Sequence, residues 1–391
     1  MKVFMINSVC GIRSTGRICT DLAETLIDNG HQCEIAYGRE TVPEKYSDIS
    51  YRIGSECGVR MHALASRIFD CSGFCSKKPT EKLICEIERF KPDVIHLHNL
   101  HGYYLDIETL FEYLASADIP VVWTLHDCWA FTGHCAYFAA AKCERWRDGC
   151  HNCPQKSTYP ASFVLDRSKY NYERKKRFFT SVSNMTLVTP SDWLAGLVRD
   201  SYLAKYPVQV IRNGIDLSVF KPTDSDFREK HGIGDKKMIL GVASVWSERK
   251  GLNDFIALSK LVDKQTCIVL VGVNKKQQGM LPENIIGIER TNNVRELAEI
   301  YTAADVFVNP TYEDNYPTVN LEAQACGTPV ITYRTGGSVE SVCEDSVVEQ
   351  GNIEQLNKAL FGNICIKSDL VLDMRCQTKD YLHLFNNIVL N

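Results

Sequence analysis

The residues with the clearest chemical potential lie in an acidic segment, NPTYEDNYPTVNLE, at residues 309–322. Pro317 suits the first turn of a helix, and Gly327 suits the left-handed residue that ends one. Glu313 and Asp314 then lie just before a helix amino terminus, which binds phosphate, and carboxylates nearby accept hydrogen bonds from sugar hydroxyls. The segment therefore predicts a nucleotide-sugar site. The alternative is that these acids only cap the helix or face solvent.

A second candidate for binding an anion is the basic turn SERKG at residues 247–251. Arg249 and Lys250 follow an apolar run at residues 238–243, which has the length of a buried strand. Ligands of parallel sheets bind beyond the carboxyl ends of the strands, so we expect these cations to face a phosphate. A solvated basic turn is the alternative.

His126 and Asp127 follow another apolar run, at residues 121–125, and so should also lie at the carboxyl end of a strand. A histidine at this position can hydrogen-bond a sugar or an acceptor. The alternative is a core histidine whose hydrogen bonds are satisfied by Asp127.

A glycine turn near the amino terminus, GIRSTGR, has the glycine spacing of a P-loop. Arg17 and Ile18 replace the Lys and Ser/Thr of that motif, so an NTPase is disfavoured. The remaining prediction is that Gly16 lets a phosphate or sugar approach a helix start closely.

Four cysteines within residues 127–168 have the spacing C-x7-C-x6-C-x2-C, with His134 and His151 beside them. Four sulfurs ending in Cys-x-x-Cys fit a tetrahedral structural zinc site, which would staple a loop with little core of its own. Disulfides or packed thiols are the alternative, although a cytoplasmic chain rarely keeps disulfides. The predicted zinc ligands are Cys135, Cys143, Cys150 and Cys153.

The composition is that of a folded protein of enzyme size. The chain has 391 residues, 45% hydrophobic and 24% charged, and this length fits two domains better than one. A formal net charge of -4 gives no reason to expect a nucleic-acid partner. The 17 cysteines cannot all pair and no run of 18 apolar residues occurs, so we expect a reducing, cytoplasmic location.

Alternating strand-like and helix-like patterns must position the candidate residues. In the first half, strand-like runs occur at residues 2–8, 32–37, 93–97, 121–125 and 185–189, with helices around Ile18, Leu22 and Leu26 and over residues 107–116. A second series of strand-like runs begins near residues 208–212 and continues at residues 238–243, 267–272, 285–288, 306–309 and 330–333.

These patterns predict an α/β protein with two doubly wound, Rossmann-like domains and a ligand cleft between them. The predicted domains are residues 1–200, with the Cys-rich insertion at about 127–168, and residues 201–391, with a final helix over 374–390.

A basic aromatic segment, residues 167–179, is the candidate for contact with a membrane surface. Its cations include Arg174, Lys175, Lys176 and Arg177, and four aromatic rings are interleaved with them. Docking on anionic lipid is the functional interpretation, and a solvated helix face is the alternative.

Taken together, these residues resemble the large family of retaining glycosyltransferases with the GT-B fold, called family four, especially its capsule, O-antigen and exopolysaccharide branch. The resemblance covers nearly the whole chain. It rests on STGR, TLHD, TPSDWL, IRNGID, RKG and the acidic segment that continues as EAQACGTPV, at residues 14–17, 124–127, 189–194, 211–216, 249–251 and 309–330.

The resemblance implies roles for the candidate residues. Gly16 would lie near the donor phosphate, His126 would reach the donor sugar or the acceptor, and Lys250 would neutralise the diphosphate. The first acid of the segment would bind the sugar, and Glu322 the ribose hydroxyls. The catalytic residues expected are His126, Lys250 and Glu313, and the substrate-binding residues are Gly16, Arg249, Asp314, Asn315, Tyr316 and Glu322.

Two departures from the family pattern leave alternatives open. Family members usually have seven residues between two glutamates; Glu313 and Glu322 have eight between them, and Asp314 keeps the usual spacing. The first-acid role therefore belongs to Glu313 or to Asp314. The family also has an arginine about six positions before the lysine, where this chain has Ser244 and Val245, and Arg249 is the candidate replacement.

The expected function is a metal-independent, retaining hexosyltransferase of surface polysaccharide synthesis, such as capsule or lipopolysaccharide. The donor would be a UDP- or GDP-sugar and the acceptor a lipid-linked glycan, met peripherally at the inner face of the membrane. No cofactor for catalysis is expected, only the structural zinc. The alternatives are a nucleotide-sugar epimerase of the same fold and a nucleotide-sugar-binding protein without catalysis.

Overall fold

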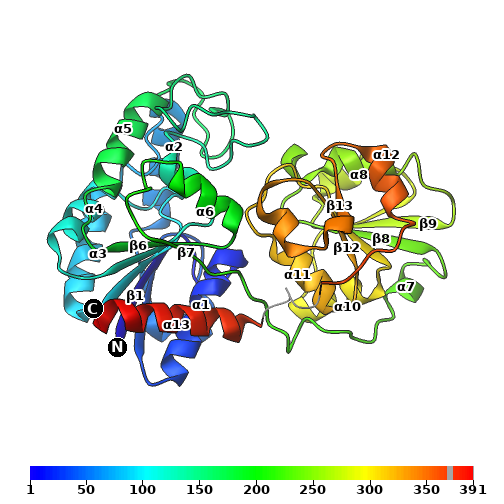
Figure 1. The fold of residues 1–391 in the computed structure, drawn as a ribbon, viewed down its shortest axis with the longest axis horizontal. Coiled ribbons are helices and arrows are strands. Elements are labelled where there is room, and N and C mark those ends of the chain that lie inside the picture. The colour runs from blue at the N-terminus through cyan, green and yellow to red at the C-terminus, as the bar shows by residue number, and fades with distance from the viewer. Residues whose placement is uncertain (368–372, 391) are drawn as a thin grey trace. The chain divides into compact units, whose positions relative to one another are not determined.

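The computed structural model describes residues 1–367 and 373–390 (Figure 1). The chain divides into two compact units. The first consists of Met1–Ile211 together with the segment from Thr378 onward, and the second of Arg212–Gln377.

Among the described residues, the first unit builds one parallel sheet of seven strands in the order β3-β2-β1-β4-β5-β6-β7. Alternate side chains of a strand enter different cores: Phe4 and Ile6 belong to one cluster, Val3 and Met5 to another. Both faces are therefore covered, as expected for a doubly wound sheet. The strands are β1 (Lys2–Asn7), β2 (Gln32–Tyr37), β3 (Ser50–Arg52), β4 (Val94–Leu97), β5 (Val121–Thr124), β6 (Met185–Thr189) and β7 (Val208–Val210).

Helix α1 of the first unit packs an apolar stripe against this sheet. In α1, Ile18, Leu22 and Leu26 are buried, which confirms the predicted βα unit. Asp106 begins α4 by accepting a hydrogen bond from Thr109 N at 3.0 Å. The helices are α1 (Arg13–Asp28), α2 (Glu56–Phe69), α3 (Lys77–Phe90), α4 (Ile107–Ser116), α5 (Ser168–Phe179) and α6 (Asp192–Arg199), with short 3-10 turns at η1 (Glu44–Ile49) and η2 (Trp129–Phe131).

In the second unit, the described ranges 212–367 and 373–377 contain a parallel sheet of six strands in the order β10-β9-β8-β11-β12-β13. Leu240 and Phe307 face one core and Ile239 and Val308 the other, so this sheet is also covered on both faces. The strands are β8 (Lys237–Val242), β9 (Thr266–Val271), β10 (Ile285–Ile288), β11 (Val306–Asn309), β12 (Val330–Tyr333) and β13 (Val347–Val348).

Most helices of this unit are short and connect successive strands. They are α7 (Phe227–Lys230), α8 (Leu252–Leu258), α9 (Lys275–Gln278), α10 (Val294–Ala303), α11 (Thr318–Ala325) and α12 (Ile353–Ala359), with 3-10 turns at η3 (Glu248–Lys250), η4 (Gly336–Ser341) and η5 (Glu344–Ser346). The two doubly wound α/β units predicted from the sequence are confirmed.

The division between the units differs from the predicted residues 1–200 and 201–391. The strand β7 pairs with β6 in the first sheet, Leu187 opposite Val208, and does not begin the second series. The final helix α13 (Met374–Leu390) was predicted at its observed bounds, but Tyr381 and Phe385 are buried in the core of the first unit. A helix joins the sheet against which it buries its apolar side chains, and sequence order alone does not identify that sheet.

Within residues 1–367 and 373–390, no helix combines the length and the apolar character that crossing a bilayer requires.

Candidate functional site

The acidic loop of the second unit lies against the basic turn. The loop connects β11 to α11, and the basic turn η3 follows β8, the neighbour of β11 in the sheet. Lys250 Nζ lies 2.5 Å from Asp314 Oδ2, and Arg249 Nη1 donates to the backbone oxygen of Glu313 at 2.6 Å. Two cations and the two candidate acids thus meet beside the first residues of α11.

Close backbone packing fixes the shape of this loop. The φ of Gly336 is +49°, and a Cβ there would lie 2.1 Å from the Asp314 carbonyl oxygen. Gly337 N donates to the same oxygen at 3.1 Å, and Tyr312 N donates to Arg249 O at 2.8 Å. The loop conformation therefore depends on a glycine at position 336 and on backbone contact with the basic turn.

Glu313 and Asp314 have different surroundings. Glu313 is only 1% exposed and offers its carbonyl to Arg249. The Asp314 side chain is 18% exposed, pairs with Lys250 and accepts from Asn315 N at 3.0 Å. Asp314 also keeps the seven-residue spacing to Glu322. The structure therefore places the Asp314 carboxylate against Lys250.

Glu322 lies on α11 and is 9% exposed. Its Oε2 accepts a hydrogen bond from the Tyr301 hydroxyl at 3.0 Å, and burial together with this carboxylate raises the pKa of Tyr301 well above its usual range. The Tyr301 hydroxyl therefore stays protonated and holds the Glu322 carboxylate in one orientation.

Asn315 and Tyr316 complete the loop and are 4% and 3% exposed. The carbonyl oxygen of Tyr316 accepts from Asn213 Nδ2 at 3.3 Å, which ties the loop to the IRNGID segment. Burial raises the pKa of Tyr316 to about 12, and its hydroxyl has no hydrogen-bond partner among the residues that the structure describes.

In the first unit, His126 lies just after β5 and is partly buried. Its Nε2 lies 3.0 Å from His98 Nδ1, and burial lowers its pKa to about 4, so the ring is neutral at pH 7. The Asp127 carboxylate lies 2.7 Å from His101 Nε2. A neutral imidazole at the carboxyl edge of the sheet can both donate and accept a hydrogen bond.

Several residues around His126 were missed by the sequence reasoning. His98 contacts it directly, and His101 links Asp127 to the hydroxyl of Tyr159 through Nδ1 at 2.9 Å. The available signal was the HLH pattern at the end of the strand-like run 93–97, because residues that follow neighbouring strands β4 and β5 share one edge of the sheet.

Gly16 lies in the first turn of α1 and is buried. A Cβ at this position would lie 3.1 Å from Val9 Cγ2 and 3.3 Å from Val9 O, so the glycine lets α1 pack closely on the turn after β1. The helix start predicted at this glycine is present, and the approach of a phosphate or sugar stays a prediction.

The four cysteines predicted to bind zinc line one small cavity with Phe138 and Trp146. Gly133 N donates to Cys150 Sγ at 3.2 Å, and the Cys135 thiol hydrogen-bonds Cys153, which lowers the pKa of Cys153 to about 7. Across the part of the chain that the structure describes, no three Cys, His, Asp or Glu side chains are arranged so that they could hold a metal ion. The zinc therefore stays a prediction.

Residues 167–179, the predicted lipid-docking segment, expose Arg167, Lys169, Lys176 and Arg177 but not all of their cations. Lys175 is fully buried, where its Nζ donates to Trp129 O at 2.9 Å and Thr132 O at 3.2 Å, and burial lowers its pKa to about 7. Arg174 pairs with Glu108. Two of the four central cations are thus engaged inside the first unit, because α5 turns one side towards the core.

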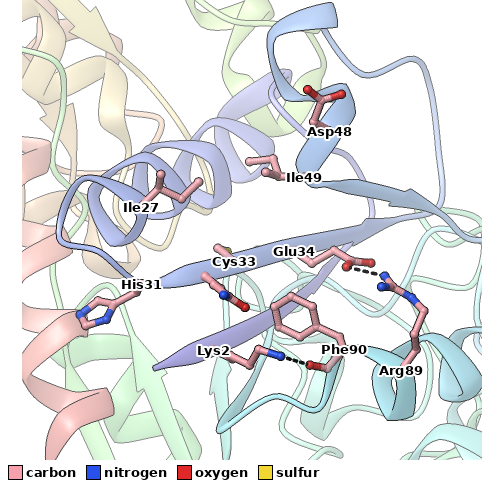
Figure 2. Close-up of a pocket in the computed structure, with 10 residues that line it drawn as sticks. Lys2, Ile27, His31, Cys33, Glu34, Asp48, Ile49, Arg89 and Phe90 are labelled. Carbon is pink, nitrogen blue, oxygen red and sulfur yellow. Dashed lines mark hydrogen bonds and ion pairs between the residues drawn. The ribbon is translucent and has the colours of Figure 1, made fainter.

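A cavity of about 550 Å³ lies where the strands β1 and β2 of the first sheet begin, whereas His126 follows the end of β5 (Figure 2). Lys2 and Gln32, the first residues of β1 and β2, line it, and Figure 2 shows the Glu34–Arg89 ion pair at its side. It contains none of the predicted site residues. Because ligands of doubly wound sheets bind at the carboxyl ends of the strands, this cavity is not the candidate site.

Comparison with known proteins gives two family matches that together span most of the chain. The family described as Glycosyltransferase Family 4 matches residues 15–219, and the one described as Glycosyl transferases group 1 matches residues 223–361. The chain is 25% identical over 293 residues to the putative colanic acid biosynthesis glycosyl transferase WcaC of Escherichia coli (strain K12), covering 69% of each chain.

Two solved structures are similar over nearly the whole length. Sucrose-phosphate synthase from Thermosynechococcus elongatus has a TM-score of 0.67 at 16% identity, covering 100% of this chain and 96% of that one. Anabaena HepE in complex with UDP and glucose has a TM-score of 0.68 at 14% identity, covering 99% of this chain and 100% of that one. These likenesses show the fold, two Rossmann-like units with parallel sheets.

Proposed function

The chain belongs to glycosyltransferase family 4 and has the GT-B fold, and we propose that it is a retaining, metal-independent hexosyltransferase that uses a nucleotide diphosphate sugar. The proposed acceptor is a lipid-linked glycan of surface polysaccharide synthesis. Similarity to WcaC, a putative colanic acid glycosyl transferase, supports the polysaccharide role. Similarity to HepE, solved with UDP and with UDP-glucose, supports a UDP-sugar donor.

One observation carries the proposal: Lys250 and Arg249 meet the acidic loop beside the first residues of α11. The group with the most negative charge in a nucleotide sugar is the diphosphate, and two cations with a helix amino terminus offer the complementary charge. Asp314, in the loop, supplies an acceptor for sugar hydroxyls. Glu322, on α11, supplies an acceptor for the ribose hydroxyls. These residues match the chemical parts of such a donor.

The main catalytic contribution proposed is electrostatic. As the bond between the sugar C1 and the diphosphate breaks, negative charge grows on the departing phosphate, and Lys250 and Arg249 stabilise it. The acceptor oxygen bonds to C1 on the same face, and its proton passes to the departing phosphate. Because these cations neutralise the phosphates directly, the step as proposed needs no metal ion.

His126 of the first unit is proposed to bind the donor sugar or the acceptor. Its pKa of about 4 keeps the imidazole neutral at pH 7, which suits hydrogen bonding to a hydroxyl group. We further propose that Gly16 lies near the donor phosphate, because it is in the first turn of α1, where backbone N–H groups are free to bind an anion.

A structural zinc ion in the cysteine cluster of the insertion is proposed separately from the catalytic role. All four thiols line one cavity, and Gly133 N donates to Cys150 Sγ, a contact that also stabilises a thiolate. The metal would hold the insertion 127–168, which has few regular elements of its own.

The experiment that tests the proposal combines a donor screen with analysis of the product. UDP-, GDP- and dTDP-sugars are compared by thermal stabilisation of the full chain, and the stabilising donor is incubated with short lipid-linked acceptors. NMR of the product should show the anomeric configuration of the donor, with turnover unchanged by EDTA. An inverted product, or turnover that EDTA abolishes, would contradict the mechanism.

A further inference from the structure

The helix α2 exposes an apolar stripe to solvent. Met61, Leu64 and Ile68 are 61%, 52% and 37% exposed, and Phe69 at its end is 48% exposed. At about 100° per residue, the first three lie on the side opposite to the buried face of the helix. A surface helix normally turns its apolar side inward, so this stripe requires a partner.

A neighbouring loop extends this stripe into a patch. Phe163 and Val164 are 64% and 61% exposed, and Leu165 is 38% exposed. Two backbone hydrogen bonds hold the loop against the end of α2: Phe163 N donates to Arg67 O at 2.7 Å, and Leu165 N to Ile68 O at 3.0 Å. We call these residues the α2 patch, which consists of Met61, Leu64, Ile68, Phe69, Phe163, Val164 and Leu165.

On α2 and on the loop of the α2 patch, exposed cations outnumber the exposed acids Glu56 and Asp166. Arg60 and Arg67 lie on one flank of α2, and Arg167 and Lys169 follow the loop. Within the described ranges, Arg67, Arg167 and Lys169 make no ion pair, whereas Arg60 has an exposed pair with Glu56. An apolar surface with a cationic rim complements an anionic lipid interface, where acyl chains meet phosphate groups.

The α2 patch is connected to the acceptor side of the candidate site. On the buried side of α2, His62 packs edge-on against Tyr103, which contacts the ring of Tyr159. The Tyr159 hydroxyl hydrogen-bonds His101, and His101 pairs with Asp127, the residue after His126. A bilayer touching the α2 patch would therefore lie across this helix from the chain of contacts that leads to Asp127.

We propose that the α2 patch inserts shallowly into an anionic lipid bilayer and so brings a lipid-linked acceptor to the carboxyl edge of the first sheet. This inference rests on the proposed lipid-linked acceptor. It moves the apolar contact from residues 167–179, where Lys175 turns inward, to α2 and the loop, and it keeps Arg167 and Lys169 as part of the cationic rim.

The test is co-sedimentation of the full chain with vesicles of phosphatidylglycerol and phosphatidylcholine, and with vesicles of phosphatidylcholine alone. We expect binding to the anionic vesicles that weakens with added salt. The variant Leu64→Ser/Ile68→Ser should lower the partition coefficient by about tenfold or more, because both side chains are exposed and would lose their burial in lipid. The matched control, Leu261→Ser/Met280→Ser, removes two exposed apolar side chains from the second unit and should bind like the wild type.

Two readouts separate this inference from the proposed function. Transfer to a soluble, short-chain acceptor should be the same for wild type and Leu64→Ser/Ile68→Ser, with unfolding temperatures within a few degrees of each other. Failure of the wild type to bind anionic vesicles while it transfers sugar to the soluble acceptor would overturn the inference alone. Unchanged vesicle binding in the variant, or a patch that instead holds two copies of the chain together in solution, would also overturn it.

Discussion

The substitution Lys250→Ala isolates one charge at the proposed diphosphate site. Lys250 Nζ lies 2.5 Å from Asp314 Oδ2, and the two side chains are 23% and 18% exposed. Arg249 keeps its own bond to the Glu313 carbonyl, so the second cation should stay in place when Lys250 is truncated. The variant therefore measures the contribution of a single ammonium group.

The expected effects on turnover and on stability differ in size. Removing one group that stabilises developing charge typically lowers kcat by about 10²–10³, which is about 2.7–4 kcal/mol. The folded state loses a partly exposed ion pair, which contributes about 0–1 kcal/mol. We therefore expect kcat/KM to fall at least a hundredfold, while the unfolding temperature shifts by about 2–4 °C at most.

The assay measures release of the nucleoside diphosphate at saturating acceptor, with the unfolding temperature followed by circular dichroism. Lys260→Ala, which truncates an exposed lysine in the same unit, is the matched control and should keep full activity. Lys250→Arg should recover part of the lost activity, because the charge returns with a different shape. A folded Lys250→Ala variant within twofold of wild type would remove Lys250 from the site.

Further predictions concern the two acids, the ribose, the metal and the acid stability. Asp314→Ala should lower transfer more than Glu313→Ala, since Asp314 contacts Lys250 and keeps the spacing to Glu322; the reverse order would restore Glu313 as first acid. Glu322→Ala should weaken nucleotide binding by about tenfold, because the ribose loses a charged hydrogen-bond acceptor. Calorimetry with UDP or GDP measures this affinity, and an unchanged value would contradict the role of Glu322. Metal analysis of purified protein should find one zinc per chain, and a metal-free protein with four freely titrating thiols in the cysteine cluster would refute the zinc site. The free energy of unfolding should fall as pH drops from about 6.5 towards 4, because the unfolded chain protonates histidines that burial keeps neutral in the folded state. Thermal unfolding measured at pH 7.5 and at pH 5 checks this prediction. Equal stability at the two pH values would contradict the lowered pKa values of His62, His96 and His126.

The strand and helix pattern of this chain was predictable because buried parallel strands are short, nearly continuous apolar runs. The strands β2, β6, β10, β11 and β12 occur at their predicted bounds. The edge strand β3 was not predicted, because its residues are only half-buried and show no apolar run. Membership in a sheet was harder to predict, as β7 and α13 show: hydrogen-bond pairing and tertiary packing decide it, and neither has a local signal.

The candidate site could be predicted where chemistry and strand ends coincide in sequence. Lys250 and Asp314 are 64 residues apart, yet both follow strands that are neighbours in the sheet, so their meeting follows from topology. The choice between Glu313 and Asp314 did not follow, because a loop can turn either side chain towards the cation. Contacts of the loop backbone with Gly336 and Gly337 make that choice.

The α2 patch shows where helical periodicity fails as a guide to burial. On periodicity alone, the stripe of Met61, Leu64 and Ile68 predicts the core-facing side of α2. The structure buries the opposite side, which carries His62 and Ser66, because His62 Nδ1 lies 2.9 Å from Ser76 Oγ and His62 Nε2 accepts from Gly73 N at 3.3 Å. Once its polar atoms are satisfied, burying that side costs little, and the apolar stripe is left for an external partner. An apolar helix face therefore identifies a contact surface, and only the tertiary structure tells whether the contact is with the protein core or with something outside it.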